Sequence, residues 1–511
     1  MPNSITNYTT ENRGRVLLLF LLFLLAIYEF VTAGFNSFAI VCCLPLIVLF
    51  IYVAFNFRMF TFWLLIVINY FVQMKGFPLP LPTSLPNEML QIILLGVAII
   101  DARQNPHFER AANPMLLALV IWCTFCTLEI LNDTCGLGIH FEAWYTGARM
   151  MAFQLLYIFL VFSIYISSPE ILSKYIKLWA LLSLFSAIWT WKQVNIGLTQ
   201  SEMNFLYGAG RTTHIIQGGT LIRYFSTFSD AANYGCNAAA SAVAFFVFGI
   251  TSKITKEKIF FFIVGAFVMK SMFSSGTRTG IFVFFAGFAV YIFLSKSFKI
   301  AIPASIIGAF FLFILAFTNI GQGNQQIRRM RSAFDKNDAS SNVRDINQET
   351  MRKYMKDAPW GIGLGMKGTL VPANNKYNLM STIPADSEYI FIWLRTGRIG
   401  ITVFIITMLI MLAGACYIVF FRLKSPSLRG IGGGLCSAFV AIQLGGYANM
   451  VLLQFPNALI FYGGLTIVYL LPYLEPAWIE YENKKIADIQ EKKQRKKEKK
   501  KLSYRVEQTY F

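Results

Sequence analysis

The sequence predicts an all-α, polytopic transmembrane helical bundle of about 12–14 spans, with one large extracytoplasmic loop that contains short helices. Of the 511 residues, 56% are hydrophobic and only 14% are Asp, Glu, Lys or Arg. The mean hydropathy is +0.54. A soluble chain has no means of burying so much apolar surface, so the lipid bilayer is the expected solvent. The same numbers disfavour a disordered chain, a disulfide-rich secreted domain and a nucleic-acid-binding protein.

Apolar runs of roughly 20 residues, the length that crosses the hydrocarbon core, recur along the chain. The first run lacks a small-residue cleavage site, so it is interpreted as a span and not as a signal peptide. The predicted spans lie near 16–34, 37–55, 59–76, 87–101, 114–131, 148–167, 172–194, 230–250, 257–274, 278–295, 298–318, 397–421, 431–449 and 453–473.

Basic residues predict the orientation of these spans. Alternate short loops carry Lys or Arg, from Arg13 near the N-terminus to Arg429 near the C-terminus. Such loops are cytoplasmic by the positive-inside rule, and the tail Lys484–Lys501 falls on the same side. Both termini are therefore expected in the cytoplasm, and the segment near 319–386 is expected on the outer face.

The predicted spans and loops divide the chain into five parts. They are the N-terminal transmembrane helices 1–194, the central helices 195–318 with an outer loop 195–229, the large loop 319–386, the C-terminal transmembrane helices 387–473, and the basic cytoplasmic tail 474–511. We expect the tail to form a solvated helix on anionic lipid.

The positive charge is unevenly distributed. The net charge is +19, and the tail segment Lys484–Arg505 contributes +8, which leaves +11 elsewhere. The large loop carries 10 Lys and Arg against 6 Asp and Glu, on the side where basic residues are usually scarce. Within this loop, Ser341–Tyr354 is predicted to form an amphipathic helix and Pro359–Gly365 a tight turn.

Several arginines are predicted at the outer ends of spans, where a guanidinium is costly and binds phosphate oxygens well. The alternative for each is an interfacial side chain that extends to lipid headgroups. They are Arg149, Arg211, Arg223, Arg278, Arg395 and Arg398.

Three spans that run inward begin at polar sequences on the outer face, and helix N-termini favour anions. These starts are Ser226–Asp230, Ser274–Gly280 and Pro384–Tyr389. If they converge, the helix ends and arginines form a pyrophosphate cradle, with Asp386 or Glu388 as a general base. The alternative is that Asp230 and Asp386 are N-caps.

Other kinds of site lack the necessary residues. His107 is expected in the cytoplasm, so a histidine metal site on one face is not expected, and no outer segment contains Asp-x-Asp. The chain has no Walker A motif. Proton- or ion-coupled transport usually requires acidic residues deep in the membrane, and here they are few.

At the three helix starts the chain resembles the O-antigen ligase/O-antigen polymerase family of bacterial membrane glycosyltransferases, over roughly residues 200–420. Arg223–Asn233 is similar to the family's Arg, Gly-x-Phe and Asn-Pro-Asn stretch, without its proline. Ser274–Gly280 is similar to its Ser-x-Ser-Arg helix start. Ala358–Gly365 is similar to Pro-x-x-Gly-x-Gly, and Asp386–Gly400 to a His-Asn segment that ends in two glycines.

The resemblance implies a metal-independent, inverting transfer of a glycan from undecaprenyl pyrophosphate, without a cofactor. Arg223 and Arg278 would neutralise the leaving pyrophosphate, and Asp386, with Glu388, would orient or deprotonate the acceptor hydroxyl. Further substrate-binding candidates are Arg211, Asp230, Asn233, Ser275, Thr277, Arg328, Arg344, Tyr389 and Arg395.

Asp386 stands where ligases of this family have a histidine, which favours a polymerase of lipid-linked repeat units. A ligase that transfers glycan to lipid A-core is the alternative, and a non-enzymatic flippase or transporter is the second. The implied partners are a lipid-linked donor and acceptor, membrane lipid and a chain-length regulator protein, with no nucleic acid. The implied location is the bacterial inner membrane.

Overall fold

The computed structural model describes residues 13–33, 48–49, 51–75, 84–101, 108–216, 221–295, 298–332 and 339–509. The predicted span 37–55 lies largely outside these ranges, and His107 lies outside them. Within them the chain is almost entirely helical, apart from strands β1 (Ile215–Ile216) and β2 (Leu221–Ile222), which pair antiparallel.

The N-terminal half contains α2 (Arg13–Ala33), α4 (Arg58–Phe71), α5 (Leu85–Asp101), η1 (Phe108–Ala111), α6 (Pro114–Leu128), η2 (Glu129–Leu131), α7 (Phe141–Ala148), η3 (Arg149–Phe153), α8 (Gln154–Tyr165), α9 (Pro169–Asn195), α10 (Gln200–Tyr207), α11 (Arg211–His214) and α12 (Ala231–Thr251). The C-terminal half contains α13 (Thr255–Ser274), α14 (Thr279–Ser295), α15 (Phe298–Phe317), α16 (Gln325–Arg331), α17 (Ala339–Met355), α18 (Asn378–Thr382), α19 (Glu388–Tyr417), η5 (Ile418–Arg422), α20 (Pro426–Ala448), η6 (Ala458–Tyr462) and α21 (Gly463–Thr509).

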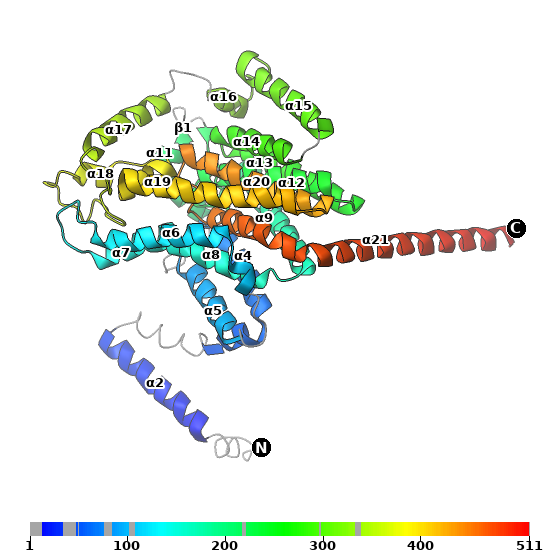
Figure 1. Ribbon diagram of the computed structural model, residues 1–511, viewed down its shortest axis with the longest axis horizontal. Coiled ribbons are helices and arrows are strands. Elements are labelled where there is room, and N and C mark those ends of the chain that lie inside the picture. Colours follow the sequence, from blue (N-terminus) through cyan, green and yellow to red (C-terminus); the bar gives the residue numbers. More distant parts are fainter. Residues whose placement is uncertain are drawn as a thin grey trace.

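The predicted fold class is confirmed. Among the described residues, seven helices are long and apolar enough to cross a membrane, and three shorter apolar helices, 58–71, 85–100 and 279–295, accompany them. A helix lies at every predicted span within the described ranges. The chain is therefore a multi-pass membrane protein built as an all-α bundle (Figure 1).

The centre of the bundle is α12, which packs against α13, α14 and α20. Its sequence is rich in Ala, with Gly235, Ser241 and Gly249 between them, and most of its side chains are buried. The facing helix α20 contains a run of three glycines, Gly432–Gly434. Small residues on both helices let the backbones approach closely, which is how membrane helices gain packing contacts without a hydrophobic driving force.

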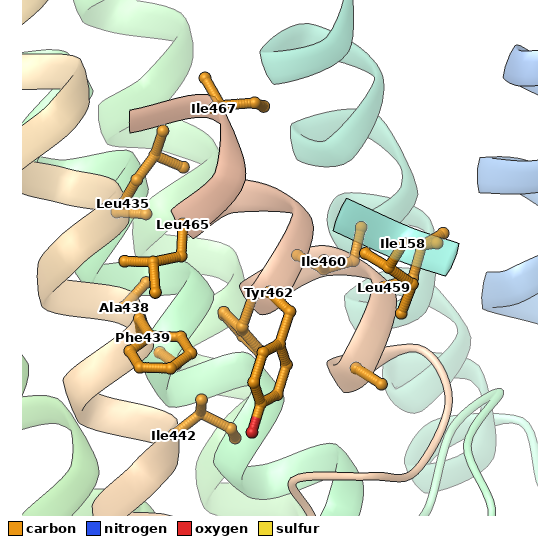
Figure 2. Packing of buried hydrophobic residues seen from close by; sticks show 14 of the residues in the cluster. Ile158, Leu435, Ala438, Phe439, Ile442, Leu459, Ile460, Tyr462, Leu465 and Ile467 are labelled. Atoms are coloured by element: carbon orange, nitrogen blue, oxygen red, sulfur yellow. The ribbon is translucent and has the colours of Figure 1, made fainter. Parts of the chain in front are cut away.

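The last membrane helix inserts large side chains between its neighbours. Figure 2 shows Tyr462 of η6 beside Phe439 and Ile442 of α20. The rings of Tyr462 and Phe439 meet edge to face, with centroids 5.2 Å apart. The Tyr462 hydroxyl lies 3.3 Å from Gln443 Nε2, so this buried phenol has a polar partner.

The large outer loop folds around a small core of its own. Met351 and Met355 of α17 pack with Ile362, Tyr377 and Leu394, separately from the main core. The predicted amphipathic helix is confirmed by α17, whose apolar face covers this second core. The loop is therefore a folded cap and not a simple connector.

The helix after the loop begins at Glu388, nine residues before the predicted start of its span at 397. The difference arises at Gly397, whose φ of +65° breaks the helical conformation within α19. The loop's glycine turn docks at this break, where the amides of Ile362 and Gly363 donate to the carbonyls of Leu394 and Arg395. The predicted tight turn thus fixes the loop to α19.

Ion pairs join the helices at the opposite end of the bundle from the loop. Glu257 pairs with Lys177 at 2.9 Å and with Lys485 at 2.6 Å, and Lys253 pairs with Glu482 at 2.7 Å. Figure 1 shows α17 and α18 at one end and the C-terminal part of α21 projecting from the other. The predicted helical tail is confirmed, as a continuation of the last span.

Gly365→Ala is expected to destabilise the protein strongly. Gly365 has a φ of +72°, and a Cβ there would collide with the Ala143 backbone of α7. We expect a loss of more than about 3 kcal/mol, measured as a lower midpoint of thermal unfolding in detergent. Gly136→Ala is the matched control, because Gly136 has a φ of +64° and open space around its Cβ position. Equal losses in the two variants would show that the turn is not clamped against α7.

Candidate functional site

The Arg223 guanidinium is the centre of a hydrogen-bond network that joins the segment before α12 to the turn before α14. Its Nη1 donates to the Thr213 carbonyl at 3.0 Å, its Nη2 to Thr277 Oγ1 at 3.1 Å and its Nε to the Ser275 carbonyl at 3.3 Å. Burial lowers the pKa of Arg223, Asp230 opposes this shift, and the positive charges of Arg278 and Arg344 add to it. Arg223 thus joins the outer segment before α12 to the turn before α14, close to two further arginines.

The turn before α14 lies directly on the first turns of α12. Thr277 Oγ1 donates to the Ala231 carbonyl at 2.8 Å. A Cβ on Gly235 would collide with Ser275 and Thr277, so only glycine permits this approach. Ser275 and Thr277 are buried. These two predicted binding residues therefore hold two helix starts together.

The N-terminus of α12 is occupied by protein groups. Asp230 Oδ1 accepts from the amides of Ala232 at 2.8 Å and Asn233 at 2.9 Å, and His214 Nε2 accepts from the Ala231 amide at 3.2 Å. Asp230 is thus the N-cap, the alternative left open by the sequence. The expectation that this helix end offers free amides to an anion is wrong, because a carboxylate and an imidazole already bind them.

His214 is held in its neutral form by this arrangement. Its Nδ1 lies 3.1 Å from the Gly210 carbonyl, which requires a donor there and leaves Nε2 as the acceptor for Ala231. Burial lowers the pKa of His214 to about 4, and the positive charge of Arg223 contributes to the shift. No local pattern in the sequence signals this contact, because the turn formed by β1 and β2 separates His214 from α12.

Two more arginines and a carboxylate come from the large loop and its neighbours. Arg278 Nη1 donates to the carbonyl of Ser332 at 3.0 Å and to its hydroxyl at 3.2 Å. Arg344 of α17 pairs with Asp386 at 3.7 Å, and both side chains are partly exposed. Arg278 directly follows Thr277, whose hydroxyl accepts from Arg223, and both Arg278 and Arg344 lie near enough to act electrostatically on Arg223. Asp386 joins these three arginines through its ion pair with Arg344. We call these four residues the arginine cluster.

Asp386 does not cap α19, so the alternative role suggested for it is wrong. The N-cap is Ser387, whose hydroxyl donates to the Gly446 carbonyl of α20 at 3.2 Å. Asp386 instead faces Arg344 from the chain just before α19. Its carboxylate is thereby available at the partly exposed edge of the arginine cluster.

The segment 449–457 between α20 and η6 is a part of the site that the sequence did not reveal. Asn457 Nδ2 donates to Asn233 Oδ1 and to the Val451 carbonyl, both at 2.7 Å. Asn237 Nδ2 donates to Asn457 Oδ1 at 2.7 Å. The segment is mostly apolar, so the sequence places part of it in the predicted span 453–473. Pro456 and Asn457 are typical of a break in a helix. Asn233, a predicted binding residue, is buried here and fixes this segment to α12.

The same segment ties the starts of α12 and α19 together. Ser229 Oγ lies 2.6 Å from Gln454 Oε1 and 2.9 Å from Asp230 Oδ2. Glu388 Oε2 accepts from the Leu452 amide at 2.9 Å, and the Glu388 side chain is buried. Glu388 therefore anchors segment 449–457, and Asp386 is the exposed carboxylate of the pair.

The structure does not bring four other predicted residues into the arginine cluster. Arg211 is exposed on α11, and Arg328 is exposed and donates to the Gln322 carbonyl. Arg395 stacks over Phe391 near the glycine turn. The Tyr389 hydroxyl bonds to Gln443 of α20 at 2.9 Å and faces a separate cavity of about 130 Å³. The described residues contain no group of three or more His, Cys, Asp or Glu placed to hold a metal ion.

Residues 266–405 match the family model described as O-antigen ligase. The match covers 140 of the 511 residues, so this part of the chain is similar to the O-antigen ligase family. A comparison with curated proteins finds no match. The similarity supports a membrane glycosyl-transfer function in O-antigen assembly and a glycosyltransferase-like activity.

The matched residues cover most of the arginine cluster. They include Arg278, Arg344 and Asp386, together with most of the loop core and the glycine turn. Arg223 and segment 449–457 lie outside the matched residues, on either side of them in the sequence. The site is therefore completed by parts of the chain that the family model does not match.

Lowering the pH from 7 towards 4 is expected to destabilise the protein through His214. The folded-state pKa of about 4 lies below the unfolded value of roughly 6.5, so the unfolded chain binds the proton first. The stabilisation is complete above about pH 6.5 and is lost as the pH falls towards 4. Thermal unfolding midpoints measured across this range should fall less steeply in His214→Gln, whose amide oxygen replaces the acceptor without titrating. Parallel curves for both proteins would contradict the assignment.

Proposed function

We propose that the protein is a polymerase of lipid-linked polysaccharide repeat units. It transfers a glycan from undecaprenyl pyrophosphate to a sugar hydroxyl of another lipid-linked repeat unit, at the outer face of the bacterial cytoplasmic membrane. The observation that carries this proposal is the convergence of Arg223, Arg278, Arg344 and Asp386 from four separate segments. A site with three guanidinium groups and one exposed carboxylate suits a reaction in which a pyrophosphate leaves.

In the proposed reaction the acceptor hydroxyl oxygen attacks the anomeric carbon of the donor from the face opposite the pyrophosphate. The new glycosidic C–O bond forms as the bond between that carbon and the pyrophosphate oxygen breaks, which inverts the configuration. The hydroxyl proton passes to Asp386, and the bonding electrons leave with the lipid pyrophosphate. Arg223 and Arg278 stabilise this negative charge as it develops, so they bind the transition state more strongly than the ground state.

The rigidity of the arginine cluster supports this role. Arg223 is fixed by three hydrogen bonds and Arg278 by two to Ser332, so their charges require little rearrangement when the pyrophosphate leaves. Arg344 holds Asp386 towards the same place. We propose that the loop side is extracytoplasmic, with both termini in the cytoplasm, because the basic short loops lie at the opposite end.

A ligase that transfers the glycan to lipid A-core is the second candidate, since the matching family model is described as O-antigen ligase. Asp386 in place of the expected histidine favours the polymerase. The two activities differ in the glycan that accumulates when the protein is lost. In either case a chain-length regulator protein is the proposed partner that sets the glycan length.

Arg278→Ala and Arg223→Ala are expected to lower polymer formation about 100-fold or more, because each removes a cation from the leaving pyrophosphate. The variants are expressed in a deletion strain and the surface glycan is separated on a gel. Polymerase loss leaves single repeats on the carrier or core, ligase loss leaves long unattached polymer, and flippase loss traps single units in the cytoplasm. Arg352→Ala, an exposed arginine of α17, is the matched control. Normal polymer in both variants, at wild-type protein levels, would refute the mechanism.

Asp386→Asn is expected to reduce the maximal transfer rate by about 100-fold while the KM for the donor changes little. Asparagine keeps the shape of the side chain but accepts no proton from the acceptor hydroxyl. The measurement is transfer by purified protein in detergent as a function of donor concentration. An unchanged maximal rate would contradict the role of Asp386 as the base, and its remaining role would be the ion pair with Arg344.

A further inference from the structure

Two adjoining cavities on the side of the bundle are not explained by the arginine cluster. One, of about 360 Å³, lies between α9 and α13 and includes Gln326 of α16 in its lining. The other, of about 340 Å³, lies between α13, α15 and α16. Lys270 and Gln326 line both cavities, so the two are neighbours. We call them together the α13 groove.

The wall of the α13 groove is largely apolar and open to the side of the bundle. Ile188 and Trp191 of α9 and Phe267 of α13 line it, and each is more than half exposed. On its other side, Ile327 and Met330 of α16 complete the lining. Such a surface, which includes the long apolar helix α9, suits a long apolar chain.

The α13 groove also carries two cations. Lys270 lies one turn from the C-terminal end of α13, the end predicted to be outer. The positive-inside rule explains lysines at cytoplasmic helix ends, so it does not explain this one. Arg331 Nη2 donates to the Ile320 carbonyl, whereas Nε and Nη1 are buried and have no hydrogen-bond partner among the residues that the structure describes. Buried guanidinium donors are costly without an anion, so the chemistry at this end of the groove favours a phosphate.

The cations of the α13 groove are next to the arginine cluster but distinct from it. Ser274 lines the groove, and the carbonyl of the next residue, Ser275, accepts from Arg223. Arg331 lines the groove, and the next residue, Ser332, accepts from Arg278. In each of these two segments, one residue lines the groove and the next residue binds an arginine of the arginine cluster. Two anionic headgroups would lie side by side, each with its own cations.

We propose that the α13 groove binds the lipid-linked acceptor, with its polyprenyl chain along the apolar wall and its phosphate groups at Lys270 and Arg331. This inference rests on the proposed function and deepens it. Transfer between two lipid-linked glycans requires two like-charged headgroups close together, and separate cations remove their repulsion. The arginine cluster then serves the leaving pyrophosphate, and the groove retains the acceptor while its chain grows.

The test counts bound lipid phosphates by native mass spectrometry, with undecaprenyl phosphate added to the full-length protein in a neutral detergent. The wild-type protein is expected to bind two. Lys270→Gln with Arg331→Gln should bind one, and Arg223→Ala with Arg278→Ala should also bind one. Lys356→Gln with Arg352→Gln removes two exposed cations of the outer loop and should still bind two. Two lipids on the Lys270/Arg331 variant, with wild-type affinity, would overturn the proposal.

Kinetics with separate lipid-linked donor and acceptor provide the second readout. The Lys270/Arg331 variant should raise the KM for the acceptor about tenfold and leave the KM for the donor unchanged. Val194→Trp should have the same effect, because it fills the apolar wall without removing charge. Equal changes in the KM for donor and the KM for acceptor would overturn the proposal that the α13 groove binds the acceptor, and would leave the proposed function standing. A wild-type protein that binds both lipids but transfers no glycan would instead refute the proposed function, and with it the role of the groove.

Discussion

The loop end of the bundle depends on the hydrogen bonds of one positive charge. The Arg223 side chain is partly exposed, and three of its N–H groups find acceptors within the fold, in Thr213, Ser275 and Thr277. Together with the bond from Thr277 to Ala231, these bonds hold three segments together: the segment before α12, the start of α12 and the turn before α14. The position of Arg278 follows, because it is the next residue after Thr277.

The sequence predicted the parts of the fold that follow from hydrophobicity and charge. Among the described residues, a helix lies at each run long enough to cross the membrane, since a backbone in lipid must satisfy its own hydrogen bonds. The amphipathic pattern of Ser341–Tyr354 produced α17, and the glycines of 359–365 produced the turn. The early start of α19 escaped prediction, because Arg395, Gly397 and Arg398 interrupt the apolar run while the helix continues on both sides of the break at Gly397.

Residue type alone identified only some of the site residues. The residues of the arginine cluster could be picked out as charged side chains in the predicted outer segments, where basic residues are usually scarce: Arg223, Arg278, Arg344 and Asp386. Glu388 and Asn233 were equally conspicuous, yet their side chains bind the backbone of segment 449–457, a contact across more than 60 residues that no local pattern encodes. His214 and Lys270 were missed for the same reason, since their roles arise from neighbours distant in the chain.

The last helix connects the arginine cluster end of the bundle with the opposite end. η6 follows Asn457, which is bonded to α12, and α21 continues from it to Thr509 with Pro472 and Pro476 inside the helix. At the far end Lys485 and Glu482 pair with Glu257 and Lys253 of neighbouring segments. One helical run is therefore fixed at both ends of the bundle, so the placement of segment 449–457 and the placement of the basic tail constrain each other.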